Sequence, residues 1–206
     1  MSVSVTADLF DELERYFDEL PQVTTEAARL AINDTARGPA ISLSREEMYD
    51  QVNFPAGYLG SDRLFVAKFA KNNDLEAVVT GRDRPTSLAR FATNPTPGQR
   101  GVTVQVHKGH SKMMKKAFIV KLRAGRTMDG QTFNVGLAIR LAPGEKLINK
   151  TLPAEVYATS LGPNVVLLYG PSVDQVFRSV STEVAPAVAD HAVSEFYRQF
   201  ARLSNG

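Results

Sequence analysis

Hydrophobic residues along this chain recur at two spacings, that of a helix and that of a strand. An apolar run near the C-terminus lies where a strand pattern changes to a helix pattern. Val165–Leu168 is a run of four apolar residues, two of them β-branched, which favours a short strand covered on both faces. Gly170 and Pro171 follow closely, and Pro171 suits the first position of a helix, where its missing N–H costs nothing. The pattern therefore predicts a strand that stops at Gly170 and turns directly into a helix beginning at Pro171.

The helix after this turn is expected to run to about Leu203, with Asp174 in its first turn, where a negative charge is favoured. Pro186 lies inside the span, and proline removes a helical hydrogen bond and clashes with the preceding turn. We therefore expect a kink or a break there. A stripe of apolar residues repeats every four positions: Val184, Val188, Ala192, Phe196 and Phe200. A stripe this long indicates packing against the sheet or against another subunit.

Residues 6–20 also have a helical period, and this predicts an amphipathic helix that Pro21 closes. Acids this dense on one face are seldom a catalytic pair, so a solvated face or a partner contact is the expected role. The apolar face consists of Leu9, Phe10, Leu13, Tyr16, Phe17 and Leu20. The acids that we select as candidate subunit contacts are Asp11, Glu12, Asp18 and Glu19.

Two further helical stretches are predicted before residue 50. The first should begin near Thr24 or Thr25, which are both good capping residues. Gly38-Pro39 should interrupt or kink it. The second is expected from Ile41 to Tyr49, with Ser44 as its cap.

Alternating apolar and polar residues predict strands in the middle of the chain. Residues 71–74 have the composition of a turn between two of them, so we expect a β-hairpin there. The connector 142–164 is rich in proline and glycine and is expected to hold no strand. The predicted strands, besides the buried run, are 63–69, 75–80, 102–106, 117–122 and 132–141.

These elements together predict an α+β fold. It has a mainly antiparallel sheet of about five or six strands, an N-terminal helical arm and a long C-terminal helix. We expect the arm to cover residues 1–52 and the core domain to cover residues 53–206, the two forming one structural unit.

Charge is distributed unevenly, although the formal net charge is only +2. Residues 1–50 carry eleven acidic residues against four basic ones, and residues 101–150 carry ten basic residues against two acidic ones. Such polarity suits self-assembly through opposite patches, or a surface that faces nucleic acid. The chain has no cysteine, no apolar run long enough to cross a membrane, and no pattern of a signal peptide at its start.

Catalytic motifs are missing from the sequence. It has no phosphate-binding loop of the Walker type, no dinucleotide-binding glycine motif and no Gly-x-Ser-x-Gly elbow. His107 and His110 stand among lysines, a poor setting for a metal site, and are expected to be exposed loop residues. His191 and its neighbour Asp190 point to different faces of the predicted helix. We expect no enzyme activity, no metal and no cofactor.

A basic run from Lys108 to Arg126 is the charged segment that says most about function. It is either a solubilising edge that discourages strand aggregation, or a contact with phosphates or with an acidic partner. Phe118 is its only aromatic residue, which disfavours base stacking on single strands. The candidate contact residues are Lys108, Lys112, Lys115, Lys116, Lys121, Arg123 and Arg126.

Several short segments, in their order along the chain, resemble the minor tail protein Z family of long-tailed bacteriophages. The distinctive element is Tyr169, Gly170, Pro171 and Ser172, followed by Val176-Phe177. The supporting segments are Ala31–Arg37, Pro85–Phe91, Gly101–Val106 and Ala117–Ile119. Residues 142–164 fall outside the resemblance.

The resemblance implies a non-enzymatic virion protein of the tail or neck, made in the host cytoplasm and assembled into the particle. Such proteins form rings between the tail tube or its terminator and the head connector, where DNA passes. Analogy with neck rings suggests about six copies. In a ring, the acidic arm of one copy would meet the basic run of the next. The alternative from another class is a non-enzymatic accessory protein that binds duplex DNA without sequence preference and in a salt-dependent manner.

Overall fold

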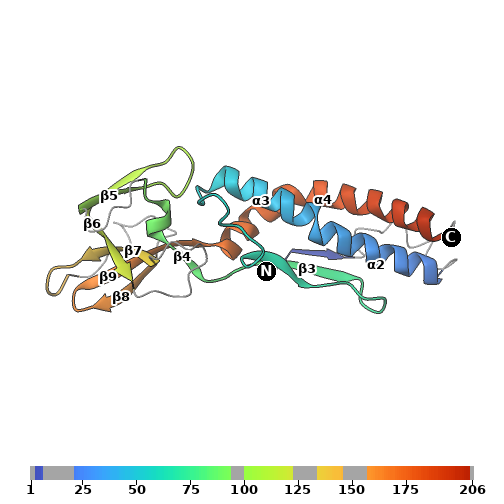
Figure 1. Cartoon of the computed structure of the whole chain (residues 1–206), viewed down its shortest axis with the longest axis horizontal. Helices are drawn as coiled ribbons and strands as arrows, with labels where there is room; N and C mark the ends of the chain where they lie inside the picture. Colours follow the sequence, from blue (N-terminus) through green and yellow to red (C-terminus); the bar gives the residue numbers. More distant parts are fainter. Residues whose placement is uncertain (1–2, 7–20, 94–99, 123–133, 146–156, 205–206) are drawn as a thin grey trace. The chain divides into compact units, whose positions relative to one another are not determined.

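The computed structural model describes residues 3–6, 21–93, 100–122, 134–145 and 157–204. The fold is α+β with mostly antiparallel strands, as predicted. The chain divides into two compact units, and each is built from separate stretches of sequence (Figure 1). We call them the helical unit (Met1–Met48, Leu59–Arg82 and Asp174–Gly206) and the sheet unit (Tyr49–Tyr58 and Asp83–Val173).

The helical unit combines long helices with a small antiparallel sheet. Its helices are α2 (Pro21–Arg37), most of α3 (Pro39–Gln51) and α4 (Val173–Ser204). Its strands are β1 (Val3–Thr6), β2 (Leu64–Lys68) and β3 (Glu76–Gly81), in the order β1-β3-β2. The predicted hairpin of residues 63–80 is confirmed as β2 and β3, which pair antiparallel across the turn at residues 71–74.

Packing of small side chains and a few buried hydrogen bonds stabilise the helical unit. The core face of α2 is fully buried and consists of Ala27, Ala28, Ala31, Ile32 and Ala36. Asn33 makes two hydrogen bonds with the backbone of Ala70, donating to its carbonyl at 3.0 Å and accepting from its N–H at 2.8 Å. Gln199 of α4 donates to Asp34 of α2 at 3.1 Å, so these two helices lie side by side (Figure 1).

In its described residues the sheet unit has six strands and a short 3-10 helix. In chain order these are β4 (Pro85–Ser87), η2 (Leu88–Phe91), β5 (Arg100–Val104), β6 (Lys112–Leu122), β7 (Asn134–Arg140), β8 (Tyr157–Gly162) and β9 (Val165–Ser172). The order in the sheet is β4-β9-β7-β6-β5, and β8 also pairs with β9. The strand β9, which the apolar run predicted, is therefore the centre of this unit.

The core of the sheet unit gathers around η2. Phe91 is 1 % exposed and lies 5.6 Å, between ring centroids, from Phe54 of the preceding connector. That connector is tied to the sheet, because the Asn53 N–H donates to the Val106 carbonyl at 2.7 Å. Ile119, Leu137 and Leu168 are buried on neighbouring strands of the sheet.

The end of the central strand corrects one prediction. The strand β9 continues through Gly170 and Pro171 to Ser172, and α4 begins at Val173 rather than at Pro171. The reason is pairing with the unpredicted strand β4. Its register shifts between Pro85 and Thr86, so no β4 residue pairs with Pro171, which has no N–H to donate. The predicted acid in the first helical turn, Asp174, is confirmed.

Gly170 is needed for close packing and not for a turn. A Cβ atom at this position would lie 2.9 Å from the Phe91 ring, which is nearer than non-bonded carbon atoms approach. A larger residue would therefore push the η2 helix away from the central strand.

Other boundaries also differ from the prediction. The helix α2 begins at Pro21, and Thr24 is fully buried inside it rather than capping it. Ser44 is likewise buried within α3, which begins directly after Gly38, where the predicted interruption is confirmed. The helix α4 continues through Pro186 without a break.

Three of the described strands, β1, β4 and β8, escaped prediction because they are short or rich in small residues. The strand β8 lies inside the connector that was expected to be irregular, and β6 begins at Lys112, earlier than predicted. Thr6 ends strand β1 instead of starting a helix. The rest of that predicted helix, residues 7–20, lies outside the described residues.

Candidate partner-binding surface

The predicted basic residues lie on strand β6 and on the turn before it. Lys108 precedes the strand, and Lys112, Lys115, Lys116 and Lys121 lie on it. All five are exposed. We call these five residues the basic strand surface. Arg123 and Arg126, the other two candidates, lie outside the described residues.

A bulge in β6 exposes two successive lysines. Met114 pairs with Val102 and Phe118 pairs with Arg100, so three residues of β6 face the single residue Gly101 of β5. Gly101 has a φ of +74°, which glycine adopts without strain. In a regular strand successive side chains point to opposite faces, so two adjacent lysines would lie on opposite faces of the sheet. The bulge lifts this restriction for Lys115 and Lys116.

Two exposed ion pairs involve residues of the basic strand surface. Lys116 Nζ lies 3.5 Å from Glu145 Oε1, and Lys108 Nζ lies 2.9 Å from Asp50 Oδ1. Both pairs are solvent-exposed, and exposed pairs of this kind contribute little to stability. Within the described ranges, Lys115 has no ion-pair partner. Exposed ion pairs of this kind can be exchanged for contacts with a partner at little cost.

A groove of about 630 Å³ runs beside the bulge. Lys115, Lys116 and Arg140 supply three positive charges, and Glu145 supplies one negative charge. The backbone N–H of Ala142 donates to Glu145, and together with Lys116 it holds the pKa of that carboxyl below its ordinary value. The carboxylate therefore stays ionised at neutral pH, and the groove keeps an excess of positive charge. The lining residues are Lys115, Lys116, Phe118, Arg140, Leu141, Ala142 and Glu145.

Arg140 and Glu145 were not among the predicted contact residues. Arg140 ends strand β7, two residues after Ala138, the partner of Phe118 in the sheet. Positions two apart share a face of the sheet, so Arg140 lies on the face of Phe118. The alternation of β7 gives the side of the strand on which Arg140 lies. Its position next to Phe118 follows only when β6 is paired correctly with β7.

Lys121 belongs to the other face of the same strand. It pairs with Val135, whereas Phe118 pairs with Ala138, and residues an odd number apart in a strand point to opposite faces. The structure thus gathers Lys115 and Lys116 at one groove and places Lys121 away from it. The four predicted acidic contacts, Asp11, Glu12, Asp18 and Glu19, lie outside the described residues.

The distinctive Tyr-Gly-Pro-Ser element has structural contacts. Tyr169 pairs with Ser87 on one side and with Tyr157 on the other, and Ser172 is buried opposite Pro85. Gly170 packs under Phe91. The element therefore holds the centre of the sheet unit and is not itself an exposed binding site.

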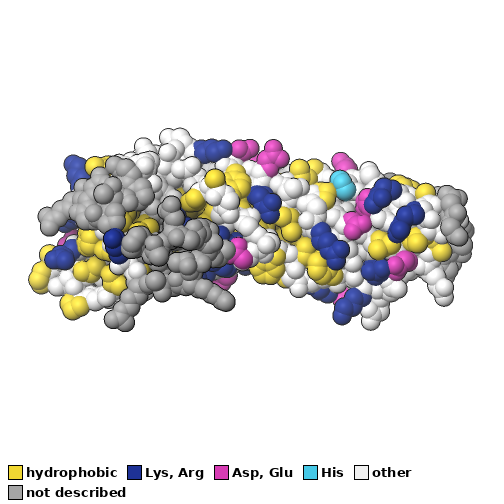
Figure 2. Space-filling model, in the orientation of Figure 1, with side chains coloured by type: hydrophobic (Ala, Val, Ile, Leu, Met, Phe, Trp, Pro, Cys, Tyr) yellow, Lys and Arg dark blue, Asp and Glu magenta, His cyan; other side chains and the backbone are white. Residues whose placement is uncertain are grey.

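Charge separates between the two units. The sheet unit has thirteen basic and five acidic residues, a formal charge of +8, and the helical unit has eleven basic and seventeen acidic residues, a formal charge of −6. Six of the seventeen acids belong to residues 7–20. Figure 2 shows basic and acidic side chains interspersed over the part of the helical unit that it displays in colour. The acidic excess of that unit therefore comes mainly from its N-terminal segment.

A metal-ion site is not found among the residues that the structure describes. Among those residues, no group of three or more histidine, aspartate or glutamate side chains is placed to hold a metal ion. In the same ranges, every helix is too short or too polar to cross a membrane. Comparisons of the chain with protein-family models, with curated proteins and with solved structures find no match.

Proposed function

We propose that this chain is a structural virion protein of a bacteriophage tail or neck, which assembles as a ring at the head–tail junction. The observation that carries the proposal is the bulged, exposed basic strand surface in a unit of charge +8, in a chain whose other unit has a charge of −6. The resemblance to the minor tail protein Z family supplies the biological setting.

Opposite charges on two units suit a contact that repeats from copy to copy. The sheet unit of one copy would face the acidic segment of the helical unit of the next, with Lys112, Lys115 and Lys116 opposite acids such as Asp11 and Glu12. This is a head-to-tail contact, and it closes into a ring when the rotation between copies fits. Electrostatic attraction of this kind speeds association and weakens as salt rises.

The segments that carry the resemblance also fit a scaffold role. Asn33 and Asp34, within the segment Ala31–Arg37, tie α2 to the β2–β3 hairpin and to α4. Phe91 and Gly170, from two other segments, pack against each other. Motifs that hold a scaffold, with no catalytic constellation among the described residues, favour a structural protein over an enzyme.

Charge reversal on the basic strand surface tests the proposal. In a phage that depends on this protein, the combined variant Lys112→Glu, Lys115→Glu and Lys116→Glu should lower the yield of infectious particles by at least a hundredfold. The isolated variant should unfold at the same denaturant concentration as the wild type, because all three side chains are exposed.

The matched control keeps the charge and changes the side chains. The combined variant Lys112→Arg, Lys115→Arg and Lys116→Arg should retain the wild-type yield. A normal yield from the glutamate variant would remove the proposal. Equal losses in both variants would point to shape rather than charge and would also contradict it.

A second candidate function is non-specific binding of duplex DNA by a monomer or dimer. The three cations around the groove of Lys115, Lys116 and Arg140 favour it, because they are placed to contact phosphates. The isolated protein should then bind a short duplex at low salt, and the logarithm of its affinity should fall linearly with the logarithm of salt concentration. If the protein fails to bind the duplex at low salt, this candidate is wrong.

A further inference from the structure

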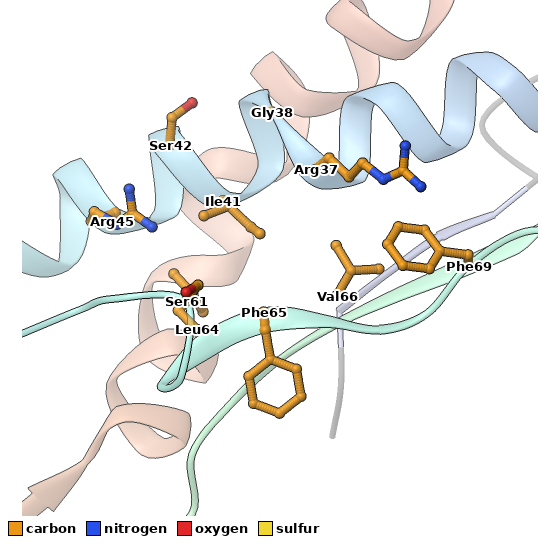
Figure 3. A pocket seen from close by; sticks show the side chains of 10 residues that line it. All are labelled: Arg37, Gly38, Ile41, Ser42, Arg45, Ser61, Leu64, Phe65, Val66 and Phe69. Atoms are coloured by element: carbon orange, nitrogen blue, oxygen red, sulfur yellow. The ribbon is translucent and has the colours of Figure 1, made fainter.

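A second groove lies in the helical unit, between the α2–α3 junction and strand β2. Its volume is about 430 Å³, within the range of pockets that receive ligand or partner side chains. Figure 3 shows Ile41 and Val66 pointing into the space between helix and strand, with Phe69 at one end. Gly38 lies at the junction of the two helices and contributes no side chain, which keeps the groove open.

The floor of this groove is apolar and partly open to solvent. Phe69 is 38 % exposed, although a phenylalanine of a folded domain is usually buried. Leu64 and Val66 of strand β2 line the groove together with Ile41 of α3. Apolar surface that converges in this way is typical of a site where a partner inserts its own apolar side chains.

Two arginines at the groove have no acidic partner among the described residues. Arg37 places its guanidinium carbon 4.5 Å from the centre of the Phe69 ring. Arg45 has its Nε atom buried without a hydrogen-bond partner. A buried donor without a partner destabilises the folded state, and a carboxylate brought by a partner would relieve this cost.

These arginines differ from most other cations of the same unit. Arg29, Lys68, Arg178 and Arg198 all pair with nearby carboxylates. The unit as a whole has more acids than bases, so two arginines without a carboxylate at one groove are unusual. The groove therefore combines an apolar floor with positive charge that no carboxylate of the described residues neutralises, and it fits an acidic segment that carries apolar side chains.

We propose that this groove receives residues 8–20 of a second copy of the chain. The sequence pattern of that segment is complementary to the groove: it has six apolar residues at helical spacing and six acidic residues between them. Apolar residues such as Leu13 would enter between Ile41 and Val66, and acids beside them would pair with Arg37 and Arg45. The inference rests on the self-assembly that we propose above, and it adds a second contact, because an amphipathic helix can present its remaining acids to the basic strand surface of a neighbour.

The attachment of the segment favours a second copy over its own. In its own copy the segment is joined to Pro21, sixteen residues before Arg37, which is roughly 24 Å along an α-helix. As a helix, the eight residues from Leu13 to Pro21 span only roughly 12 Å, so a helical segment centred on the groove cannot also reach the start of its own α2 helix. At its other end it is joined to β1, which β3 separates from β2.

Disulfide trapping tests the contact, and the chain suits it because it has no cysteine. The full-length variants Leu13→Cys and Ile41→Cys are purified separately, marked with tags of different size, mixed and oxidised. The expected product is a heterodimer joined through these two positions, identified by peptide mass. It should form at least ten times more than the product of Leu13→Cys with Ser181→Cys, a partly exposed position on α4 that is remote in sequence from the groove. Ser42→Cys, at the exposed rim, serves as a second reporter should Ile41→Cys fold poorly.

Charge reversal and a double variant complete the test. Adding Arg37→Glu and Arg45→Glu to the groove copy should lower the heterodimer yield at least fivefold, whereas Lys71→Glu, an exposed cation of the same unit, should leave it unchanged. A yield no greater than that of the Ser181→Cys control would overturn the inference. An intramolecular disulfide in the variant carrying both Leu13→Cys and Ile41→Cys would do so too. Neither result depends on particle yield, so this inference and the proposed function fail separately.

Discussion

The two units of this chain differ in how they treat polar and charged side chains. The helical unit turns them inward: Asn33, Glu195 and Gln199 are buried, and each has hydrogen-bond partners within the unit. The sheet unit has an apolar core around Phe91 and leaves the five lysines of the basic strand surface exposed. Buried polar groups fix one arrangement of neighbouring elements, whereas exposed charges remain available to a partner.

The difference indicates where each part of the function lies. In the helical unit, changes to polar residues should alter stability. In the sheet unit, changes to polar surface residues should alter assembly and leave stability unchanged, and only changes to the apolar core should unfold it.

The largest effect is expected from the core of the sheet unit. Phe91→Ala should lower the free energy of unfolding by about 3–5 kcal/mol, because Phe91 is fully buried and its removal leaves a cavity. Urea denaturation followed by circular dichroism measures this loss. The control Met113→Ala removes a side chain that is 56 % exposed and should change the value by less than about 0.5 kcal/mol. Similar losses from both variants would contradict the assignment of the core.

Gly170→Ala should have the next largest effect. The added methyl group would lie 2.9 Å from the Phe91 ring, and overpacking of this kind costs about 1–3 kcal/mol. Gly162→Ala is the matched control, because a Cβ atom there meets no neighbour within 4 Å. If Gly170→Ala proved as stable as Gly162→Ala, Gly170 would have no role in packing.

Asn33→Ala tests the polar ties of the helical unit. It removes both hydrogen bonds to the Ala70 backbone, and leaving buried backbone groups unpaired costs about 1–3 kcal/mol. Thermal unfolding should show a lower midpoint for this variant. Asn73→Ala, at an exposed position in the nearby turn, should melt as the wild type does. A wild-type midpoint for Asn33→Ala would mean that the hydrogen bonds to Ala70 contribute nothing to stability.

A smaller, pH-dependent effect is expected from Glu195. The Arg198 side chain donates to it, and this hydrogen bond, with further help from Gln199, holds the pKa of the Glu195 carboxyl below its ordinary value. Because the folded-state pKa is depressed, the stabilisation is present above the unfolded-state value. It is lost as pH falls through the folded-state pKa. Glu195→Gln should therefore reduce the loss of stability between neutral pH and about pH 3. The exposed Glu46→Gln is the control, and an unchanged pH dependence in Glu195→Gln would contradict this role.

Local patterns in the sequence predicted the elements whose partners are close along the chain. The β2–β3 hairpin follows from alternation around the turn of residues 71–74, and the break between α2 and α3 follows from Gly38-Pro39. The exposure of Lys112, Lys115 and Lys116 follows from their charge. In each case the deciding residues are neighbours in the sequence.

Contacts between distant residues could not be predicted in this way. The strand β4 has three residues and exists through pairing with β9, which follows more than eighty positions later. That pairing also explains why Pro171 continues a strand, although proline locally favours a helix start. In the same way, the role of Asn33 depends on Ala70, and the groove beside β6 depends on Arg140 of another strand.

The most direct test of the account is the mass of the purified protein in solution, measured by light scattering over a range of protein and salt concentrations. The account predicts that the 22.5 kDa chain forms one discrete larger species at low salt. High salt should dissociate this species, and the combined variant Lys112→Glu, Lys115→Glu and Lys116→Glu should stay monomeric. A larger species that forms equally well in this variant, or a wild-type protein that stays monomeric under every condition, would contradict assembly through the basic strand surface.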